Sequence, residues 1–158
     1  MRKRRCLLDV NVLIALTDDE HEHYRAAMQW FNTSGKHDFG VCALTEAGYI
    51  RVVSRPSAVG FSIKQATAVL ADLARQPGYR FWPMVDPWSV LTAPFAERIF
   101  GHQQVTDAIL LGLAVKENGV LVTFDRGIRY LAGPQFSENV VMLGNASGST
   151  SAPPLAGS

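Results

Sequence analysis

The chain has 158 residues, of which 47% are hydrophobic and 18% are charged, and its formal net charge is +1. This length suits one globular domain with a full core and is too short for two comfortable ones. A net charge this small excludes a global basic field, so any contact with nucleic acid has to come from a local patch.

In the first half of the chain, apolar runs alternate with segments of helical spacing. In chain order we expect a strand over 6–9, helices continuing to residue 16 and over 18–31, a strand over 39–43, and helices over 44–54 and 62–75. Pro56 and the pair Pro77-Gly78 are typical stop signals for the last two helices.

The second half continues the alternation and then changes composition. We expect a strand over 79–85, a helix over 88–100 that contains Pro94, a buried helix over 105–117, and strands over 120–124 and 140–143. Residues 145–158 are rich in Gly, Ser, Ala and Pro and cannot bury enough surface to order themselves, which predicts a flexible tail. The sequence therefore predicts a single domain over 1–144.

Strands that are apolar throughout and alternate with helices indicate the α/β class, with a central parallel sheet covered on both faces. In such sheets, ligands bind beyond the carboxyl ends of the strands. Side chains at this edge are therefore the first candidates for a functional site.

Four acidic residues lie in separate apolar segments that all lead to this edge. Asp9 ends the first strand, and Glu46 lies just past the strand over 39–43. Asp107 lies in the first turn of the helix that feeds the strand over 120–124, and Asp125 follows that strand. Acids scattered by chance would have no reason to gather at one edge, so we expect the four side chains to lie together.

Carboxylates buried among Leu, Ile and Val are costly unless something cancels their charge, and four converging ones repel each other as well. A divalent cation relieves both problems, and Mg²⁺ and Mn²⁺ prefer oxygen ligands. The set therefore predicts a site for one ion, or for two ions about 3.5–4 Å apart when a phosphate bridges them. Asn11 and Thr123 can hydrogen-bond to the carboxylates, and Arg126 can contact a phosphate.

Each acid also has a simpler interpretation. Asp9 and Asp125 are suited to cap helices, and Asp107 is favourable in a first helical turn, whereas Glu46 has no such explanation. Other polar residues could lie at the rim of the site or on the ordinary solvent-exposed surface. These candidates are His102, Arg51, Arg55 and Arg129, with Trp30, Trp82 and Trp88 expected in the core or an interface.

Two cysteines, Cys6 and Cys42, lie in apolar runs and are expected to be buried, reduced thiols. The apolar stretch from residue 7 to residue 16 contains Asp9 and Asn11 and is too short to span a membrane, and no cleavage site follows it. We therefore expect neither a signal peptide nor a membrane span, and a cytoplasmic location.

The segments around the four acids resemble the motifs of the PIN-domain ribonucleases, specifically the VapC toxins of toxin–antitoxin pairs. The similarity covers roughly residues 5–143, and any one motif is weak whereas the ordered set is specific. The matching segments are Leu7 to Leu16, Thr45-Glu46, Thr106-Asp107-Ala108 and Thr123-Phe124-Asp125-Arg126-Gly127.

The resemblance implies a three-layer α/β/α sandwich and a Mg²⁺- or Mn²⁺-dependent endoribonuclease that cuts a transfer RNA or a ribosomal RNA loop. It implies that a homodimer forms and that a small VapB-like antitoxin inhibits the enzyme. The residues that it assigns to the metal and to catalysis are Asp9, Glu46, Asp107 and Asp125.

Two other functions remain to be weighed. A phosphatase with Asp9 as nucleophile would need a second carboxylate at position 11, where this chain has Asn11, so the sequence disfavours that chemistry. A catalytically silent module that binds RNA or protein stays open, although no member of the acidic set is missing.

Overall fold

The parallel arrangement of the sheet follows from the chain order, because helices separate each strand from the next and return the chain to the same edge. The computed structural model describes residues 3–56 and 60–144, and in these ranges four strands form one sheet in the order β2-β1-β3-β4. The strands are β1 (Cys6–Leu8), β2 (Phe39–Gly40), β3 (Val120–Thr123) and β4 (Val140–Met142). All pairings are parallel, so the carboxyl ends share one edge.

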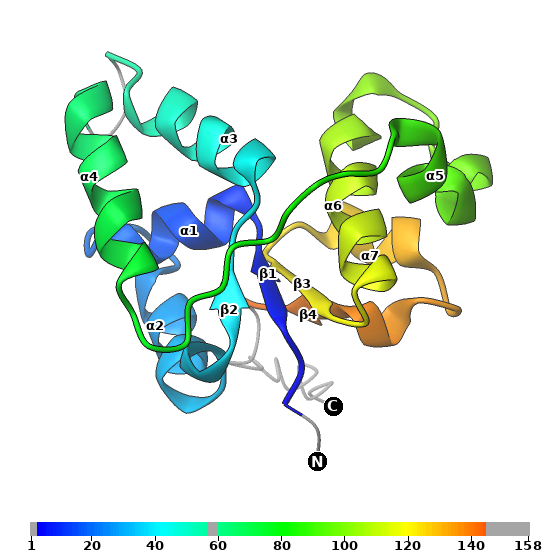
Figure 1. The fold of residues 1–158 in the computed structure, drawn as a ribbon, viewed down its shortest axis with the longest axis horizontal. Helices are drawn as coiled ribbons and strands as arrows, with labels where there is room; N and C mark the ends of the chain where they lie inside the picture. The colour runs from blue at the N-terminus through cyan, green and yellow to red at the C-terminus, as the bar shows by residue number, and fades with distance from the viewer. Residues whose placement is uncertain (1–2, 57–59, 145–158) are drawn as a thin grey trace, which may run out of the picture.

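Alternation of side chains along the strands divides the interior into two cores. Leu8 and Val122 face one core, whereas Leu7 and Leu121 face the other. The first core is covered by α1 (Val10–Thr17), α2 (Tyr24–Thr33), α3 (Ala43–Val53) and α4 (Ile63–Ala74). The second is covered by α6 (Val105–Lys116) and α7 (Arg126–Ala132), and α5 (Trp88–Thr92) packs on α6. Figure 1 shows the two helical layers on opposite sides of the sheet. The predicted three-layer α/β/α sandwich is confirmed.

The strand predicted over 79–85 is wrong. The segment lies beside β2, where Arg80 N–H donates to Phe39 O and Trp82 N–H donates to Val41 O, but only Tyr79 forms a bridge to the sheet. Pro83 follows at once and has no N–H to continue the ladder. The sequence pattern of aromatic and β-branched residues was that of an edge segment rather than a strand.

Three helix predictions also need correction. The helix predicted over 88–100 is α5 followed by a 3₁₀-helix over Ala93–Arg98, because Pro94 cannot donate the next α-helical bond. The helix predicted over 18–31 begins only at Tyr24, after turns that include the Asp18 side chain bonded to Glu20 N–H. The short helix α7 was missed. Further 3₁₀-helices cover Gly35–His37, His102–Gln104 and Ser137–Asn139.

Both cysteines are free and buried, as predicted. Burial, aided by the charge of Asp38, raises the pKa of the Cys6 thiol to about 11, so this thiol stays protonated and unreactive at neutral pH. Among the helices of the described residues, none has the length and apolar character to cross a membrane. The tail predicted over 145–158 lies outside the described residues.

Candidate active site

Asp9 lies in the junction between β1 and α1, where its backbone is extended and its side chain caps the helix. Its Oδ1 accepts from Val10 N–H at 2.8 Å, and its own N–H donates to Val122 O at 3.0 Å. The residue is only 7% exposed. Capping and a role in a site are therefore compatible, since the cap occupies one carboxylate oxygen and leaves the other to face β3.

Thr123 joins two of the acids. Its hydroxyl donates to Asp9 Oδ2 at 2.8 Å and accepts from the Asp125 N–H at 2.9 Å. Thr123 ends β3 and is fully buried, so this hydroxyl has a fixed position. Thr123 was predicted to hydrogen-bond to a carboxylate because it lies two residues before Asp125 in the sequence. The carboxylate that it contacts is that of Asp9, and Asp125 contacts Thr123 only through its backbone N–H. Asp125 itself caps α7 by accepting from Gly127 N–H at 2.8 Å.

Asp107 lies in the first turn of α6 and is half-buried. Burial raises the pKa of Asp107 to about 7, and the charges of Asp9 and Asp125 and a hydrogen bond with Asp125 add to the shift. Burial also raises the pKa of Asp9, with a contribution from the charge of Asp125, although the hydrogen bonds from Thr123 and Val10 oppose that shift. Asp9, Asp107 and Asp125, which we call the carboxylate cluster, are thus electrostatic neighbours.

Glu46 does not contribute to the pKa shifts within this cluster. It lies in the first turn of α3, at the same edge of the sheet, but it is not among the charges that raise the pKa of Asp9 or Asp107. Its charge acts on Tyr79, whose pKa is raised chiefly by burial. Among the described residues, no group of three or more His, Cys, Asp or Glu side chains is placed to hold a metal ion as it stands. That Glu46 joins the other three carboxylates around an ion stays a prediction.

The donor set nevertheless fits a hard divalent cation, because it consists of carboxylate oxygens at one edge. Within the described residues, no Lys or Arg forms an ion pair with Asp9 or Asp107. Two acids whose pKa values are raised by burial and mutual repulsion are the electrostatic condition that a cation relieves. Their role as ligands stays a prediction.

The other polar candidates are exposed to solvent. The exposed residues are Asn11 on α1, Arg51 and Arg55 in and after α3, His102 in its 3₁₀-helix, and Arg126 and Arg129 on α7. Trp82 is buried beneath the Arg5 guanidinium, which fits the predicted core role, whereas Trp88 is 42% exposed. No contact of His102 with the carboxylate cluster is found among the described residues.

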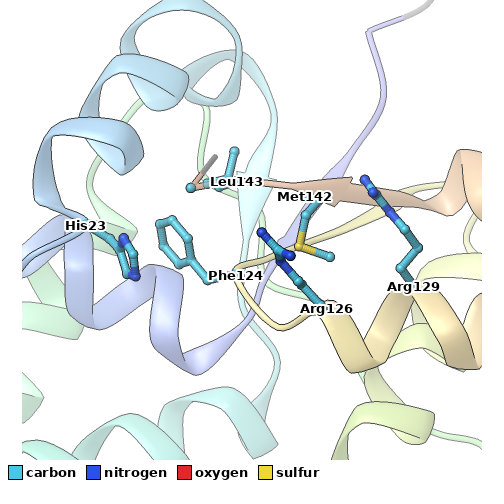
Figure 2. Close-up of a pocket in the computed structure, with 7 residues that line it drawn as sticks. His23, Phe124, Arg126, Arg129, Met142 and Leu143 are labelled. Atoms are coloured by element: carbon cyan, nitrogen blue, oxygen red, sulfur yellow. The ribbon is translucent and has the colours of Figure 1, made fainter. Parts of the chain in front are cut away.

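Next to the cluster, the ends of β3 and β4 border a cavity of about 600 Å³ that was not predicted as a unit. We call it the arginine pocket. Its lining residues are His23, Phe124, Arg126, Arg129, Met142, Leu143 and Gly144. The rings of His23 and Phe124 are stacked, with centroids 4.5 Å apart (Figure 2). Sequence patterns could not reveal this pair, because Phe124 continues an apolar strand and His23 lies in a polar stretch.

Comparison with known proteins agrees with this geometry. Residues 6–134 match the PIN domain family. Because the match spans most of the chain and includes the whole carboxylate cluster, the chain belongs to the PIN-domain family.

Relatives narrow the assignment. The chain is 40% identical to Ribonuclease VapC39 of Mycobacterium tuberculosis over 124 residues, which are 77% of this chain and 89% of the relative. It is 42% identical to Ribonuclease VapC38 of the same organism over 130 residues, covering 80% and 89% of the two chains. Within the PIN-domain family, the chain is thus a member of the VapC ribonucleases.

Solved structures share the fold at low sequence identity. The crystal structure of VapBC2 from Rickettsia felis, bound to a DNA fragment from their promoter, matches with a TM-score of 0.59 and 13% identity over 88% of this chain and 98% of that chain. Mycobacterium tuberculosis VapC20, described as a sarcin-ricin loop cleaving toxin, matches with a TM-score of 0.56 and 14% identity over 78% and 92%.

Proposed function

We propose that this chain is the toxin of a toxin–antitoxin pair and an endoribonuclease that uses Mg²⁺ or Mn²⁺. The observation that carries the proposal is the carboxylate cluster at the edge where parallel sheets bind ligands. In this cluster Asp9 is buried and Asp107 is half-buried, and neither forms an ion pair with a Lys or Arg of the described residues. It occurs in a chain 40% identical to a relative named a ribonuclease. Asp9, Asp107 and Asp125 would hold the cation, and Glu46 would complete the set.

The chain's own residues prepare the site for hydrolysis of a phosphodiester bond. Thr123 and the Val10 N–H fix both oxygens of Asp9, and the Gly127 N–H fixes one oxygen of Asp125. Without a cation, burial and the charges of Asp9 and Asp125 raise the pKa of Asp107 to about 7, and a bound cation would favour its charged form. When bound, the cation supplies Lewis-acid activation of water and neutralises charge on the phosphodiester. No histidine or lysine base is then required.

The partners follow from the same assignment. The VapBC2 structure, which contains both members of such a pair by its name, supports a small VapB-like antitoxin as the binding partner. The description of VapC20 as a sarcin-ricin loop cleaving toxin supports a ribosomal or transfer RNA loop as substrate. We also infer that the chain works in the cytoplasm, where these RNAs are found, and as a homodimer.

The test is cleavage of total cellular RNA by antitoxin-free protein, with Mg²⁺ or Mn²⁺ and with chelator, followed by mapping of new 5′ ends. Asp9→Asn should lower the cleavage rate by about a thousandfold or more, because a buried ligand loses its charge. Asp19→Asn changes an exposed residue ten positions further along the chain. It is the matched control and should cleave like the wild type. Cleavage that survives both chelator and Asp9→Asn would reject the metal-dependent mechanism.

A further inference from the structure

The arginine pocket has a divided lining. Arg126 and Arg129 lie one turn apart on α7 and extend toward β4, whereas Phe124, His23, Met142 and Leu143 form an aromatic and apolar side (Figure 2). Among the residues that the structure describes, none that lines this cavity is acidic. A ligand that fits this division has an anionic part next to a flat, weakly polar part.

The pocket also has a fixed relation to the carboxylate cluster. Phe124 immediately precedes Asp125, and the Asp125 N–H is bonded to the same Thr123 hydroxyl that holds Asp9. A polymer whose reacting bond lies at the cluster therefore has its neighbouring units within reach of Phe124 and of the arginines on α7. A second hollow of about 640 Å³ shares His23, Met142, Leu143 and Gly144 with the first and continues along α2, where both Glu22 and Arg25 line it. The pair of hollows suits an extended chain better than a small free molecule.

We propose that the arginine pocket binds a nucleotide of single-stranded RNA that flanks the cleaved bond. Arg129 and Arg126 contact the backbone phosphate, and the base lies against the aromatic side formed by His23 and Phe124. This inference rests on the proposed function and adds the part of the substrate that positions the bond. Binding of unpaired RNA commonly combines a cationic groove with aromatic side chains against which bases stack.

Arg129 provides the most direct test, because it is exposed and makes no side-chain hydrogen bond or ion pair with another described residue. Removing it should therefore leave the fold intact. The full-length Asp9→Asn protein, which does not consume its ligand, would be titrated with a fluorescent single-stranded RNA about 12 nucleotides long, at several salt concentrations. Arg129→Ala should raise Kd about tenfold and reduce the slope of log Kd against log salt by about 0.7, the value for one lost contact to single-stranded phosphate.

Two further variants show whether the effect on RNA binding depends on the position of Arg129 or only on the loss of a positive charge. Arg75→Ala removes the same charge from the end of α4, where Arg75 pairs with Asp72, and should change Kd by less than about twofold. Arg129→Lys should keep the salt slope while losing part of the affinity, because it retains the charge but not the planar fork. Equal effects of Arg129→Ala and Arg75→Ala would overturn the proposal.

The aromatic side needs its own variants. Phe124→Leu should raise Kd about five- to tenfold with an unchanged salt slope, and Phe124→Tyr should bind like the parent. Phe124 packs on the first core, so His23→Ala provides a second variant if Phe124→Leu lowers the melting temperature. Wild-type affinity in folded Phe124→Leu and His23→Ala would exclude stacking. Displacement of the RNA by an equal charge of poly-glutamate would also overturn the proposal, in favour of an acidic protein segment.

Failure of this inference can be told apart from failure of the proposed function. If wild-type protein cuts no RNA but binding still depends on Arg129 and Phe124, the proposed ribonuclease activity falls and the pocket assignment stands. If wild-type protein cuts RNA and Arg129→Ala leaves both KM and kcat unchanged, the pocket assignment falls and the activity stands. Agreement requires that KM rises about tenfold in Arg129→Ala while kcat changes much less.

Discussion

Two neighbouring parts of the carboxyl edge differ in charge, burial and the way they are held. The carboxylate cluster is negative, and its central member Asp9 is 7% exposed and bonded to backbone and to Thr123. The arginine pocket is positive and built from exposed side chains on α7 beside an aromatic pair. Groups that position a cation need rigid support, whereas groups that follow a flexible polymer need reach. The difference shows how one edge can bind a cation and an anionic chain side by side.

The largest effect is expected from a change at Thr123, because its hydroxyl hydrogen-bonds both to the Asp9 carboxylate and to the Asp125 N–H. Thr123→Val keeps the shape but should lower kcat/KM by about 10- to 100-fold. It should also lower the free energy of unfolding by about 1–3 kcal/mol, since Asp9 loses its partner in a buried position. Activity on a defined RNA and chemical denaturation would be measured together.

Two variants control for this result. Thr123→Ser retains the hydroxyl and should stay close to wild type. Thr92→Val removes another buried hydroxyl, which donates to Trp88 O in α5, and should affect stability without affecting activity. Thr123→Val with wild-type activity would show that the rigidity of Asp9 is not needed.

A smaller effect concerns pH. The pKa of Asp107 is raised to about 7 in the folded protein, so between about pH 4 and pH 7 the folded state holds a proton that the unfolded chain has released. The metal-free protein therefore loses stability as pH rises through this window, by roughly 1–3 kcal/mol after allowance for partial exposure. Asp107→Asn should remove the part of this loss that Asp107 causes, whereas the part caused by Asp9, whose pKa is also raised, should remain.

Thermal melts in chelator at pH 5.5 and pH 8 would compare the two proteins. The wild type should gain more from Mg²⁺ at pH 8 than at pH 5.5, because the cation competes with the proton. Parallel pH curves for the wild type and Asp107→Asn would mean that Asp107 titrates in its ordinary range and that the cluster is not strained by repulsion.

The smallest effect is expected at Glu46, whose charge does not contribute to the raised pKa values of Asp9 and Asp107. Glu46→Gln should reduce activity by less than about tenfold and should reduce the Mg²⁺-dependent rise in melting temperature less than Asp107→Asn does. If Glu46→Gln abolished the response to Mg²⁺ as fully as Asp107→Asn, the four carboxylates would have to close around the ion when it binds.

Much of the fold was predictable because its signals are local. Apolar strands that alternate with helices indicated the parallel sheet, and the helices predicted over 62–75 and 105–117 begin and end within about one residue of α4 and α6. The predictions that failed depended on backbone details. Pro83 and Pro94 lie in segments whose composition favours a strand and a helix, but each lacks the N–H that would extend the element.

The candidate site was predictable only in part. Topology alone placed the acids at one edge, since each follows a strand or begins a helix that runs back along one. It did not predict that Glu46 would act on Tyr79 rather than on the cluster, or that His23 would stack on Phe124. Those pairings depend on how α2 and α3 pack on the sheet. The spacing of residues along the chain does not determine this packing.

The segment beside β2 also limits how the protein can assemble. An exposed strand edge offers unpaired N–H and C=O groups to any extended chain and is a common starting point for aggregation. Here Arg80 and Trp82 already occupy the carbonyls of Phe39 and Val41, and Pro83 follows with no N–H of its own. Further strands therefore find few partners on this side, and the sheet is protected against growth into a fibril from its β2 end.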